Sequence, residues 1–411
     1  MTYPTLRERR VVVGVCGGIA AYKACEVVSR LRQAGAQVRV VMTPNATHFV
    51  GATTFRALSG YDVACELFGA IPAVEIEHIS LAEFGEVMVV VAATANVLGK
   101  VAAGICDDLL TTTVCAAAGK VIFAPAMNWR MWQNPITQRN VAALQELGYW
   151  FVGPECGHLA CGETGTGRLS PTEDILDAVD QALGPSDSAL TGKRVLITVG
   201  PTREPLDPVR FLTNPSSGKM GMALAQEALA RGAEVTLLCG PVTERAPWRA
   251  EVVAVTTTQD LLEAALARHD HADVVVGAAA PADYRPKTVA PNKIRKDGTG
   301  LTLELEETPD VLAALGARKR PGQVHVGFAA ETEELTASAA AKLERKNLDL
   351  IVANDVSRPG AGFGADTNEV TLVPRNGSSR RVAMADKRLI AAAIWDEVEE
   401  LIRRSSHRGG Q

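Results

Sequence analysis

The amino-acid sequence predicts an α/β protein made of two Rossmann-like domains with mainly parallel sheets. Short valine-rich runs alternate with helix-like segments through both halves of the chain, as in successive strand-helix-strand units. The composition agrees, because 47% of the residues are hydrophobic, only 5% are aromatic and 36 are glycine, which suits valine and isoleucine strands covered by alanine-rich helices. The length of 411 residues exceeds what one hydrophobic core usually serves, so we expect two domains.

The first half is expected to hold a parallel sheet and a closing helix. Its predicted strands are Val11–Val15, Val38–Met42, Val87–Val91 and Val121–Ala124. The closing helix is predicted from about Pro171 to Leu183. Ser170 is expected to be its N-cap, with Pro171 at the first helical position and Glu173 completing a capping box.

The second half repeats this pattern after a short polar linker at 184–188. We therefore predict one domain over residues 1–186 and another over residues 187–411. The elements expected in the second domain are strands at Val195–Val199, Val235–Leu238, Val274–Val276, Val324–Phe328, Leu350–Val352, Glu369–Val373 and Arg381–Met384, and an amphipathic helix over about Asp386–Arg403.

The net charge and the spacing of the cysteines limit the kinds of molecule that this protein is expected to bind. The net charge of -5 and pI near 5.9 offer no basic face for nucleic acid or an anionic membrane. The eight cysteines are too dispersed for the dense disulfide framework of a small secreted domain. No apolar run approaches the roughly 18 residues of a membrane span. We expect a cytoplasmic protein that acts on small molecules.

Small and polar residues follow two predicted strands of the first half. One strand runs into Gly17-Gly18, and another into Ala92-Ala93-Thr94-Ala95-Asn96. Both loops are expected at the carboxyl edge of one sheet, where open α/β sheets bind ligands and free N–H groups favour an anion. The first loop is not GxGxxG with an acidic residue about 20 positions on, which disfavours a nicotinamide-dependent reductase.

Three further motifs of the first half carry polar residues. They are His78-Ile79-Ser80-Leu81, Pro125-Ala126-Met127-Asn128-Trp129-Arg130-Met131 and Gly157-His158-Leu159-Ala160-Cys161-Gly162. Taken singly, His78 could be a surface histidine, Asn128 a turn residue and Cys161 a buried thiol. A zinc site is disfavoured, because Cys156, His158 and Cys161 give only three clustered ligands with no paired CxxC elsewhere.

As a set, these segments of residues 8–183 resemble the flavin-dependent cysteine decarboxylases that act on phosphopantothenoylcysteine. The resemblance implies His78 as the catalytic base, Asn128 as the holder of the substrate carboxylate and Cys161 as a proton donor on a mobile lid. It also implies an FMN site formed by Gly17, Gly18, Ile19, Ala20, Thr43, Thr94, Ala95, Asn96 and Met127. The chemistry fits a flavin, because an N-acylated cysteine cannot form the Schiff base that pyridoxal phosphate requires as an electron sink.

The second half carries its own set of loop motifs. They are Gly200-Pro201-Thr202-Arg203-Glu204, Asn214-Pro215-Ser216-Ser217-Gly218-Lys219, Ala278-Ala279-Ala280-Pro281-Ala282-Asp283-Tyr284-Arg285-Pro286 and Lys293-Ile294-Arg295-Lys296. Hydroxyl, glycine and lysine groups at a strand edge suit phosphate. GxxxxGK[ST] is absent, which disfavours a P-loop nucleotidase. On its own, the run from Lys293 to Lys296 could be a mobile, solvated basic cluster.

Residues 190–405 together resemble the bacterial phosphopantothenate–cysteine ligases. The resemblance implies that Asn214 handles an acyl intermediate and that Lys293 acts in catalysis as well as in nucleotide binding. It places CTP against Gly277, Ala278, Ala279, Asp283, Lys293, Pro309, Asp310, Val311, Leu312, Phe328, Lys342 and Lys346. Asp283 has more than one open role, including selection of the nucleotide through its base or its ribose. Lysines and Mg²⁺ held through the phosphates would neutralise the charge of departing pyrophosphate.

We therefore predict a bifunctional enzyme of coenzyme A biosynthesis. Its ligase half would join cysteine to 4'-phosphopantothenate with CTP, through an acyl-cytidylate. Its flavin half would convert 4'-phosphopantothenoylcysteine to 4'-phosphopantetheine. A flavoprotein-like regulatory subunit is the non-enzyme alternative, against which the joint presence of His78, Asn128 and Cys161 speaks. The resemblance further implies a homo-oligomer, with FMN between protomers of a trimer and dimeric ligase halves, in an assembly such as a dodecamer.

Overall fold

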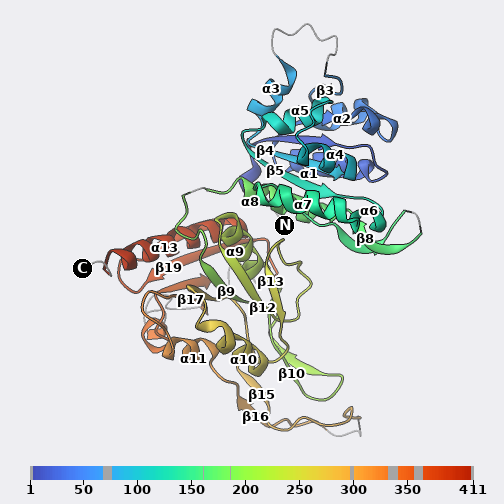
Figure 1. Cartoon of the computed structure of the whole chain (residues 1–411). Coiled ribbons are helices and arrows are strands. Elements are labelled where there is room, and N and C mark those ends of the chain that lie inside the picture. The colour runs from blue at the N-terminus through green and yellow to red at the C-terminus, as the bar shows by residue number, and fades with distance from the viewer. Residues whose placement is uncertain are drawn as a thin grey trace. The chain divides into compact units, whose positions relative to one another are not determined.

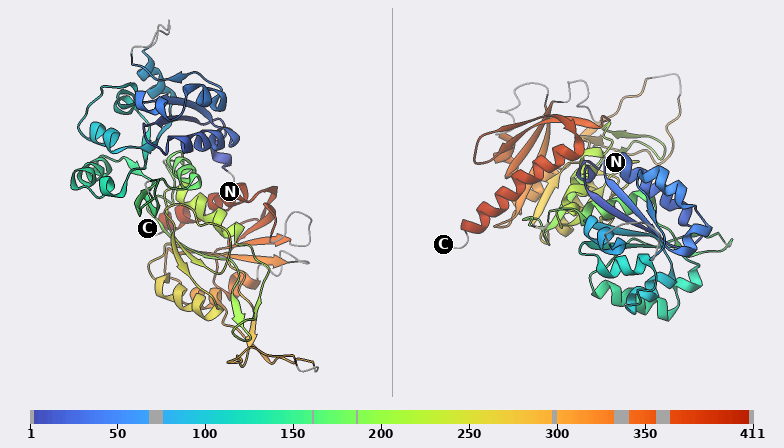
Figure 2. Two further views of the ribbon diagram at one scale, coloured as in Figure 1. Left: turned by 90° about the vertical axis from the view of Figure 1, so that its right-hand side faces the viewer. Right: turned by 90° about the horizontal axis from the view of Figure 1, so that it is seen from above.

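The chain divides into two compact units, each a sheet with helices on both faces (Figure 1, Figure 2). A computed structural model describes residues 3–67, 76–160, 162–185, 187–296, 300–331, 341–355 and 364–408. Contacts within the chain separate a first unit, Tyr3–Gly184, from a second that begins at Pro185. No helix among the described residues is long and apolar enough to cross a membrane.

The first unit is built on a parallel six-stranded sheet in the order β3-β2-β1-β4-β5-β6. Its strands are β1 (Arg10–Val15), β2 (Gln37–Met42), β3 (Val63–Ala64), β4 (Val87–Ala93), β5 (Lys120–Pro125) and β6 (Trp150–Phe151). The register places Val13 beside Val40 of β2 and Val89 of β4. All three side chains are buried, as expected for a parallel sheet covered on both faces. The four predicted strands are confirmed.

The helices of this unit form two layers. Contacts group α1 (Ala21–Gln33), α2 (Ala52–Ser59) and α8 (Thr172–Ala182) on one face of the sheet. They group α3 (Glu77–Phe84), α4 (Ala95–Ala102), α5 (Leu109–Ala116) and α7 (Pro135–Glu146) on the other. The short helices are η1 (Pro4–Leu6), η2 (Pro44–His48) and α6 (Trp129–Trp132), and β7 (Glu155–His158) pairs with β8 (Thr164–Arg168) as a separate hairpin.

The capping box predicted at the start of α8 is wrong. Pro171 is the N-cap residue, and no side chain caps this end of the helix. Glu173 is therefore the second helical residue rather than the third, the position from which a capping box is closed. Its carboxylate instead lies 3.1 Å from the Arg30 guanidinium of α1, so it links two helices of the same layer.

The second unit contains an eight-stranded sheet in the order β13-β12-β9-β14-β17-β18-β19-β20. The strands are β9 (Arg194–Val199), β12 (Glu234–Cys239), β13 (Glu251–Ala254), β14 (Val274–Gly277), β17 (Val324–Glu331), β18 (Leu350–Asp355), β19 (Thr367–Pro374) and β20 (Arg380–Asp386). The first six in spatial order are parallel, and β19 and β20 are antiparallel additions. Every strand predicted for this half is present.

Helices also cover both faces of the second sheet. One layer contains α9 (Lys219–Ala230) and the predicted C-terminal helix α13 (Lys387–Arg408). The other contains α10 (Thr258–His269) and α11 (Val311–Ala317). Two small ribbons lie outside the sheet: β10 (Arg203–Pro205) with β11 (Phe211–Thr213), and β15 (Tyr284–Pro286) with β16 (Leu305–Glu307).

The start of the second unit is tied to its last helix. The carboxylate of Glu399 on α13 accepts hydrogen bonds from the Ser188 hydroxyl at 2.8 Å and from Arg231 Nη1 at 3.0 Å. The backbone N–H of Ala189 donates to the same carboxylate. Leu190 is fully buried in the core between the sheet and α13. Residues 188–190 therefore belong structurally to the second unit.

Candidate functional site

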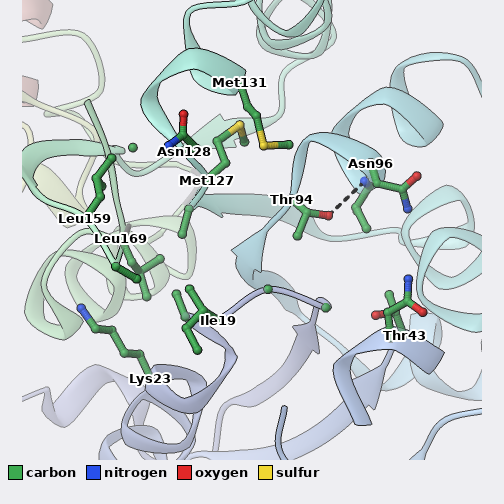
Figure 3. Close-up of a pocket in the computed structure, with 18 of the residues that line it drawn as sticks. Ile19, Lys23, Thr43, Thr94, Asn96, Met127, Asn128, Met131, Leu159 and Leu169 are labelled. Carbon is green, nitrogen blue, oxygen red and sulfur yellow. Dashed lines mark hydrogen bonds between the residues drawn. The ribbon is translucent and has the colours of Figure 1, made fainter. Parts of the chain in front are cut away.

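The first unit has a large cavity where the strand order of its sheet reverses. The two strands that follow β1 along the sheet, β2 and β4, lie on opposite sides of it, so the loops after β1 and β4 leave in opposite directions and open a crevice. The cavity there has a volume of about 1130 Å³, at or above the upper end of small-molecule sites, about 300–1,000 Å³. Figure 3 shows the side chains that line it.

The glycine turn after β1 forms one wall of this cavity. Gly17 has no room for a side chain, because a Cβ atom there would lie 2.4 Å from the Cβ of Asn45. The turn therefore packs directly against the segment that follows β2. Thr43, at the end of β2, is 5% exposed, and its hydroxyl has no hydrogen-bond partner within the described part of the chain. A buried, unsatisfied hydroxyl beside a tightly packed turn suits a polar ligand.

A second wall comes from the loop after β4. Thr94 is the N-cap of α4, and its hydroxyl accepts a hydrogen bond from the Val97 N–H at 3.3 Å (Figure 3). This bond fixes the start of α4, so Asn96 in the first turn lines the cavity together with Thr94. The two loops expected at this edge of the sheet therefore border one cavity.

The third wall combines the loop after β5 with the hairpin strand β8. The Met127 N–H donates to the Gly167 carbonyl at 3.0 Å. A Cβ atom on Gly167 would lie 2.1 Å from the Met127 carbonyl oxygen, so only glycine permits this approach. Asn128 caps α6 by accepting from the Arg130 N–H at 2.9 Å. The side chains of Met127, Asn128 and Met131 all line the cavity.

Charged groups also line the cavity. Lys100 on α4 lies 2.7 Å from Asp107 and 3.3 Å from Asp108. Its hydrogen bond to Asp107 is the main reason that the pKa of Lys100 is raised. Lys23 and Arg168 line the cavity too, and neither has an ion-pair partner among the residues that the structure describes. The nearby Cys16 thiol is fully buried, which raises its pKa to about 12 and leaves it protonated at neutral pH.

The cavity gathers most of the residues predicted for the flavin half. Every predicted FMN residue except Ala95 lines it, and so does Asn128. His78 lies on α3 and is not part of the lining. Cys161 lies outside the described residues. The sequence analysis did not predict that Lys23, Lys100, Asp107 and Arg168 line a site. One signal was available for part of this region, because the spacing of Asp108 and Thr111 is that of a capping box at the start of α5.

The second unit has a smaller cavity at the corresponding point of its own sheet. β12 and β14 flank β9, and the cavity of about 560 Å³ is lined at the strand ends by Thr198 of β9, Gly277 of β14 and Phe328 of β17. A Cβ atom on Gly277 would lie 2.6 Å from both methyl groups of Leu312. The glycine therefore lets Leu312 pack over the end of β14.

A carboxylate and an ammonium group meet at the rim of this second cavity. Asp310 caps α11 by accepting from the Ala313 N–H at 3.1 Å. The other oxygen of the same carboxylate lies 3.0 Å from Lys346 Nζ. Both side chains line the cavity, so this ion pair can exchange with a charged ligand at the rim.

The loop after β14 is held from several sides. Asn214 donates from Nδ2 to the carbonyls of Pro281 at 2.9 Å and Ala280 at 3.3 Å. Thr308 donates from its hydroxyl to the Ala282 carbonyl at 2.6 Å. The Thr308 N–H donates to the Asp283 carbonyl at 2.9 Å. Asn214 therefore acts on a loop that lines the cavity, although it is not part of the lining itself.

The predicted nucleotide residues divide into two groups. Those that line the cavity are Gly277, Ala279, Asp283, Pro309, Asp310, Val311, Leu312, Phe328 and Lys346. Ala278, Lys293 and Lys342 do not line it. Lys293 is exposed, but the next residue is anchored: the Ile294 N–H donates to Asp207 at 3.1 Å, and Arg210 donates to the Ile294 carbonyl at 3.1 Å. The basic run expected to be mobile is thus fixed at its second residue.

No group of three or more histidine, cysteine or carboxylate side chains within the described ranges could hold a metal ion.

Comparisons with known proteins assign a family to each unit. Residues 2–184 match the family model described as "Flavoprotein". Residues 190–402 match the model described as "DNA/pantothenate metabolism flavoprotein C-terminal domain". The two matches leave only a few residues between them and coincide with the two units of the structure.

Single proteins match both units at once. The chain is 47% identical to the coenzyme A biosynthesis bifunctional protein CoaBC of Bacillus subtilis (strain 168) over 405 residues, which are 98% of this chain and 100% of the relative. The protein of the same name from Escherichia coli (strain K12) is 41% identical over 397 residues, 96% of this chain and 97% of the relative. A crystal structure of the C-terminal domain of a protein with this name is 44% identical, covers 52% of this chain and 100% of its own, and has a TM-score of 0.45. The chain belongs to the family of coenzyme A biosynthesis bifunctional proteins.

Proposed function

We propose that this chain catalyses two consecutive reactions of coenzyme A biosynthesis. The second unit ligates cysteine to 4'-phosphopantothenate at the expense of CTP, and the first unit decarboxylates the resulting 4'-phosphopantothenoylcysteine to 4'-phosphopantetheine. The observation that carries the proposal is the 47% identity to one bifunctional relative across both units. A cavity at the strand-order reversal of each sheet supplies a separate site for each reaction.

The first cavity fits FMN on its own features. Thr43 offers a buried hydroxyl that lacks a partner in the described structure. The Gly17-Gly18 turn has no side chains to separate its backbone from a ligand. The turn is held in place because Gly17 packs against Asn45. Thr94 and Asn96 complete the polar lining. When bound, FMN would supply the two-electron acceptor that the decarboxylation of an acyl-cysteine needs and would give the same two electrons back before the product forms, so no other oxidant is consumed.

The remaining steps of the decarboxylation fall to side chains of this chain. Asn128 lines the cavity and caps α6 through its side-chain oxygen, and its side chain is proposed to orient the substrate carboxylate. Cys161 is proposed to deliver the final proton, because a thiol is a far stronger acid than a hydroxyl. His78 is proposed as the base. Since His78 does not line the cavity of its own chain, we propose that it serves a neighbouring protomer of a trimer.

The second cavity is proposed to take CTP. Lys346 would leave Asp310 to meet the phosphates, and Gly277, Ala279 and Phe328 would line the base or ribose. Mg²⁺ would be held through the phosphates. Asn214 would keep the loop after β14 in place while cysteine attacks the acyl-cytidylate. Lys293 would reach the pyrophosphate from outside the cavity lining, and the ligase units would pair as dimers.

The experiment that tests the proposal uses the purified full chain. We expect a yellow protein whose flavin is released by acid precipitation. With 4'-phosphopantothenate, cysteine, CTP and Mg²⁺ it should release pyrophosphate and CO₂ and form 4'-phosphopantetheine. Without cysteine, it should form a trappable acyl-cytidylate and no CO₂. A colourless protein that cannot be reconstituted with FMN would disprove the first activity, and absence of pyrophosphate release would disprove the second.

A further inference from the structure

We infer that Asp207 is a positioning residue for the ligase reaction, because its buried carboxylate fixes the backbone next to Lys293. The inference rests on the proposed function, which gives Lys293 a role at the departing pyrophosphate. Asp207 lies in the turn that joins β10 to β11, and Lys293 lies on the long connection between β15 and β16. Asp207 and Ile294 are 87 residues apart in the sequence, and the two segments meet at this carboxylate.

Each oxygen of the Asp207 carboxylate serves a different segment. Oδ1 accepts the backbone N–H groups of Val209 and Arg210, both at 2.8 Å, which closes the turn between β10 and β11. Oδ2 accepts the backbone N–H of Ile294 at 3.1 Å and lies 3.3 Å from Arg210 Nη1. The side chain is fully buried, so the bond to Ile294 is shielded from competition by water.

Two further hydrogen bonds tie the same two segments together. Arg210 Nη1 donates to the Ile294 carbonyl at 3.1 Å, so both peptide groups of Ile294 are held. The Ala290 N–H donates to the Leu206 carbonyl at 3.0 Å. The Ile294 N–H belongs to the same planar peptide group as the Lys293 carbonyl. Asp207 therefore sets the backbone from which the Lys293 side chain extends.

The other end of the hairpin formed by β10 and β11 is bound to the wall of the second cavity. Asn214, which follows β11, donates to the Pro281 carbonyl at 2.9 Å. The hydroxyl of Thr202, which precedes β10, accepts the Ala282 N–H at 3.0 Å. Pro281 and Ala282 both line the cavity. Figure 1 shows β10 next to β15, so the hairpin links the cavity wall to the connection that carries Lys293.

Fixing this backbone matters because the Lys293 side chain is exposed and can rotate. If the connection were free as well, both the backbone and the side chain would have to be ordered when the phosphates bind, at a larger cost in conformational entropy. Asp207 orders the backbone in advance. Its contribution to the rate therefore depends on the ammonium group of Lys293 being present.

Asp207→Asn separates the turn from the anchor. The remaining side-chain oxygen can still accept the N–H groups of Val209 and Arg210. The new amide NH₂ then faces the Ile294 N–H and the Arg210 guanidinium, which are also donors, so this contact is lost. Ala290→Pro is a second variant, because it removes the hydrogen bond to Leu206 and leaves the buried carboxylate intact.

The matched control is Asp273→Asn. Asp273 also accepts a backbone N–H, that of Arg194 at 2.8 Å, but it does so at the amino ends of β9 and β14, the edge of the sheet opposite the cavity. All variants are made in the FMN-loaded full chain, alone and combined with Lys293→Gln. The measurements are pyrophosphate release and trapped acyl-cytidylate with 4'-phosphopantothenate and CTP, and CO₂ release from 4'-phosphopantothenoylcysteine as a readout of the first unit.

We expect Asp207→Asn to slow formation of the acyl-cytidylate by about tenfold to a hundredfold, with KM for CTP and CO₂ release near wild type. Ala290→Pro should slow the same step, and Asp273→Asn should not. The variant that combines Asp207→Asn with Lys293→Gln should be no slower than Lys293→Gln alone, because Asp207 acts through Lys293.

Two results would overturn the inference. A wild-type rate in Asp207→Asn would show that the anchor is not needed for the reaction. Losses that multiply when Asp207→Asn, or Ala290→Pro in its place, is combined with Lys293→Gln would show that the anchor supports the fold independently of Lys293. Absence of pyrophosphate release from the wild-type chain would instead refute the proposed function.

Discussion

The hydroxyl of Thr43 shows how one buried side chain can mark a ligand site. It is buried without a partner in the described structure, an arrangement that costs free energy unless something binds there. Thr43→Val keeps the shape and removes the hydroxyl. We expect the flavin-free protein to be as stable as wild type or more stable, by up to about 1–3 kcal/mol, and FMN to bind about tenfold more weakly.

Thermal denaturation with and without FMN would test this. Thr47→Val is a suitable control, because that hydroxyl is already satisfied by the Pro44 carbonyl and lies outside the cavity lining. Lower stability of the flavin-free Thr43→Val protein, with unchanged FMN affinity, would contradict the prediction.

A buried histidine pair should make the second unit sensitive to acid. His325 of β17 and His269 of α10 are fully buried, with their Nε2 atoms 3.3 Å apart. Burial lowers the pKa of His325 to about 3, assisted by Lys319 and His269. An unfolded histidine binds a proton below about pH 6.5, whereas the folded one does not until about pH 3. The unfolded state therefore gains protons first, and stability falls as the pH drops from about 6.5 toward 3.

The expected size of this effect is about 2 kcal/mol of unfolding free energy between pH 7 and pH 5 for this one group. His325→Gln cannot titrate and should lose correspondingly less stability over the same interval. Urea unfolding of both proteins at the two pH values is the measurement. Equal losses of unfolding free energy in wild type and variant would show that His325 is not the group responsible.

At the scale of elements, the loop after β14 is held by hydrogen-bond donors from other segments of the chain. Asn214 donates hydrogen bonds to two carbonyls of this loop, so Asn214→Asp would place a carboxylate against two carbonyl oxygens. We expect KM for CTP to rise by about tenfold or more, because an unpaired charge replaces a donor. Asn214→Ala removes the bonds without adding charge and should have a smaller effect.

Pyrophosphate release at several CTP concentrations would test this ranking. If Asn214→Asp keeps the wild-type KM and only slows the attack of cysteine on the acyl-cytidylate, the residue contacts the intermediate rather than positioning the loop. That outcome would return Asn214 to the role implied by family resemblance.

The sequence predicted the sheet interiors and the glycine loops, and it missed the sheet edges and the charge pairs. Buried strands such as β1 and β14 can be predicted from their high valine content. The two-residue strands β3 and β6 are too short to show the alternation of buried and exposed residues that predicts a strand. Lys100 and Asp107 meet only because the loop before α5 folds back toward α4, which no spacing rule indicates. The predicted capping box does not form because the helix begins one residue later than predicted. Pro171 is its N-cap residue rather than its first helical residue.

At the scale of the whole molecule, we propose that the two units are separable domains. The predicted boundary at 186/187 falls close to Gly184, where the first unit ends. Fragments 1–184 and 185–411 should each fold and keep one partial reaction. A shorter fragment, 190–411, lacks Ser188 and Ala189 and so loses two hydrogen bonds to the buried Glu399 carboxylate. It should be less stable than 185–411 by about 1–3 kcal/mol.

Urea unfolding of the two C-terminal fragments checks the difference, and CO₂ or pyrophosphate release checks each activity. Glu399→Gln in fragment 185–411 is the matched comparison, because it weakens the same contacts without shortening the chain. Identical stability of 185–411 and 190–411 would mean that residues 185–189 are dispensable to the second domain.

The edges of both sheets have a further consequence for how this protein behaves at high protein concentration. Exposed strand edges are templates on which other chains can polymerise. The first sheet ends in the two-residue strands β3 and β6. One edge of the second sheet is the four-residue strand β13, and the other is β20, which begins with Arg380 and Arg381. Short edges and paired charges both resist strand addition. These borders of the two sheets are therefore protected against amyloid-like growth.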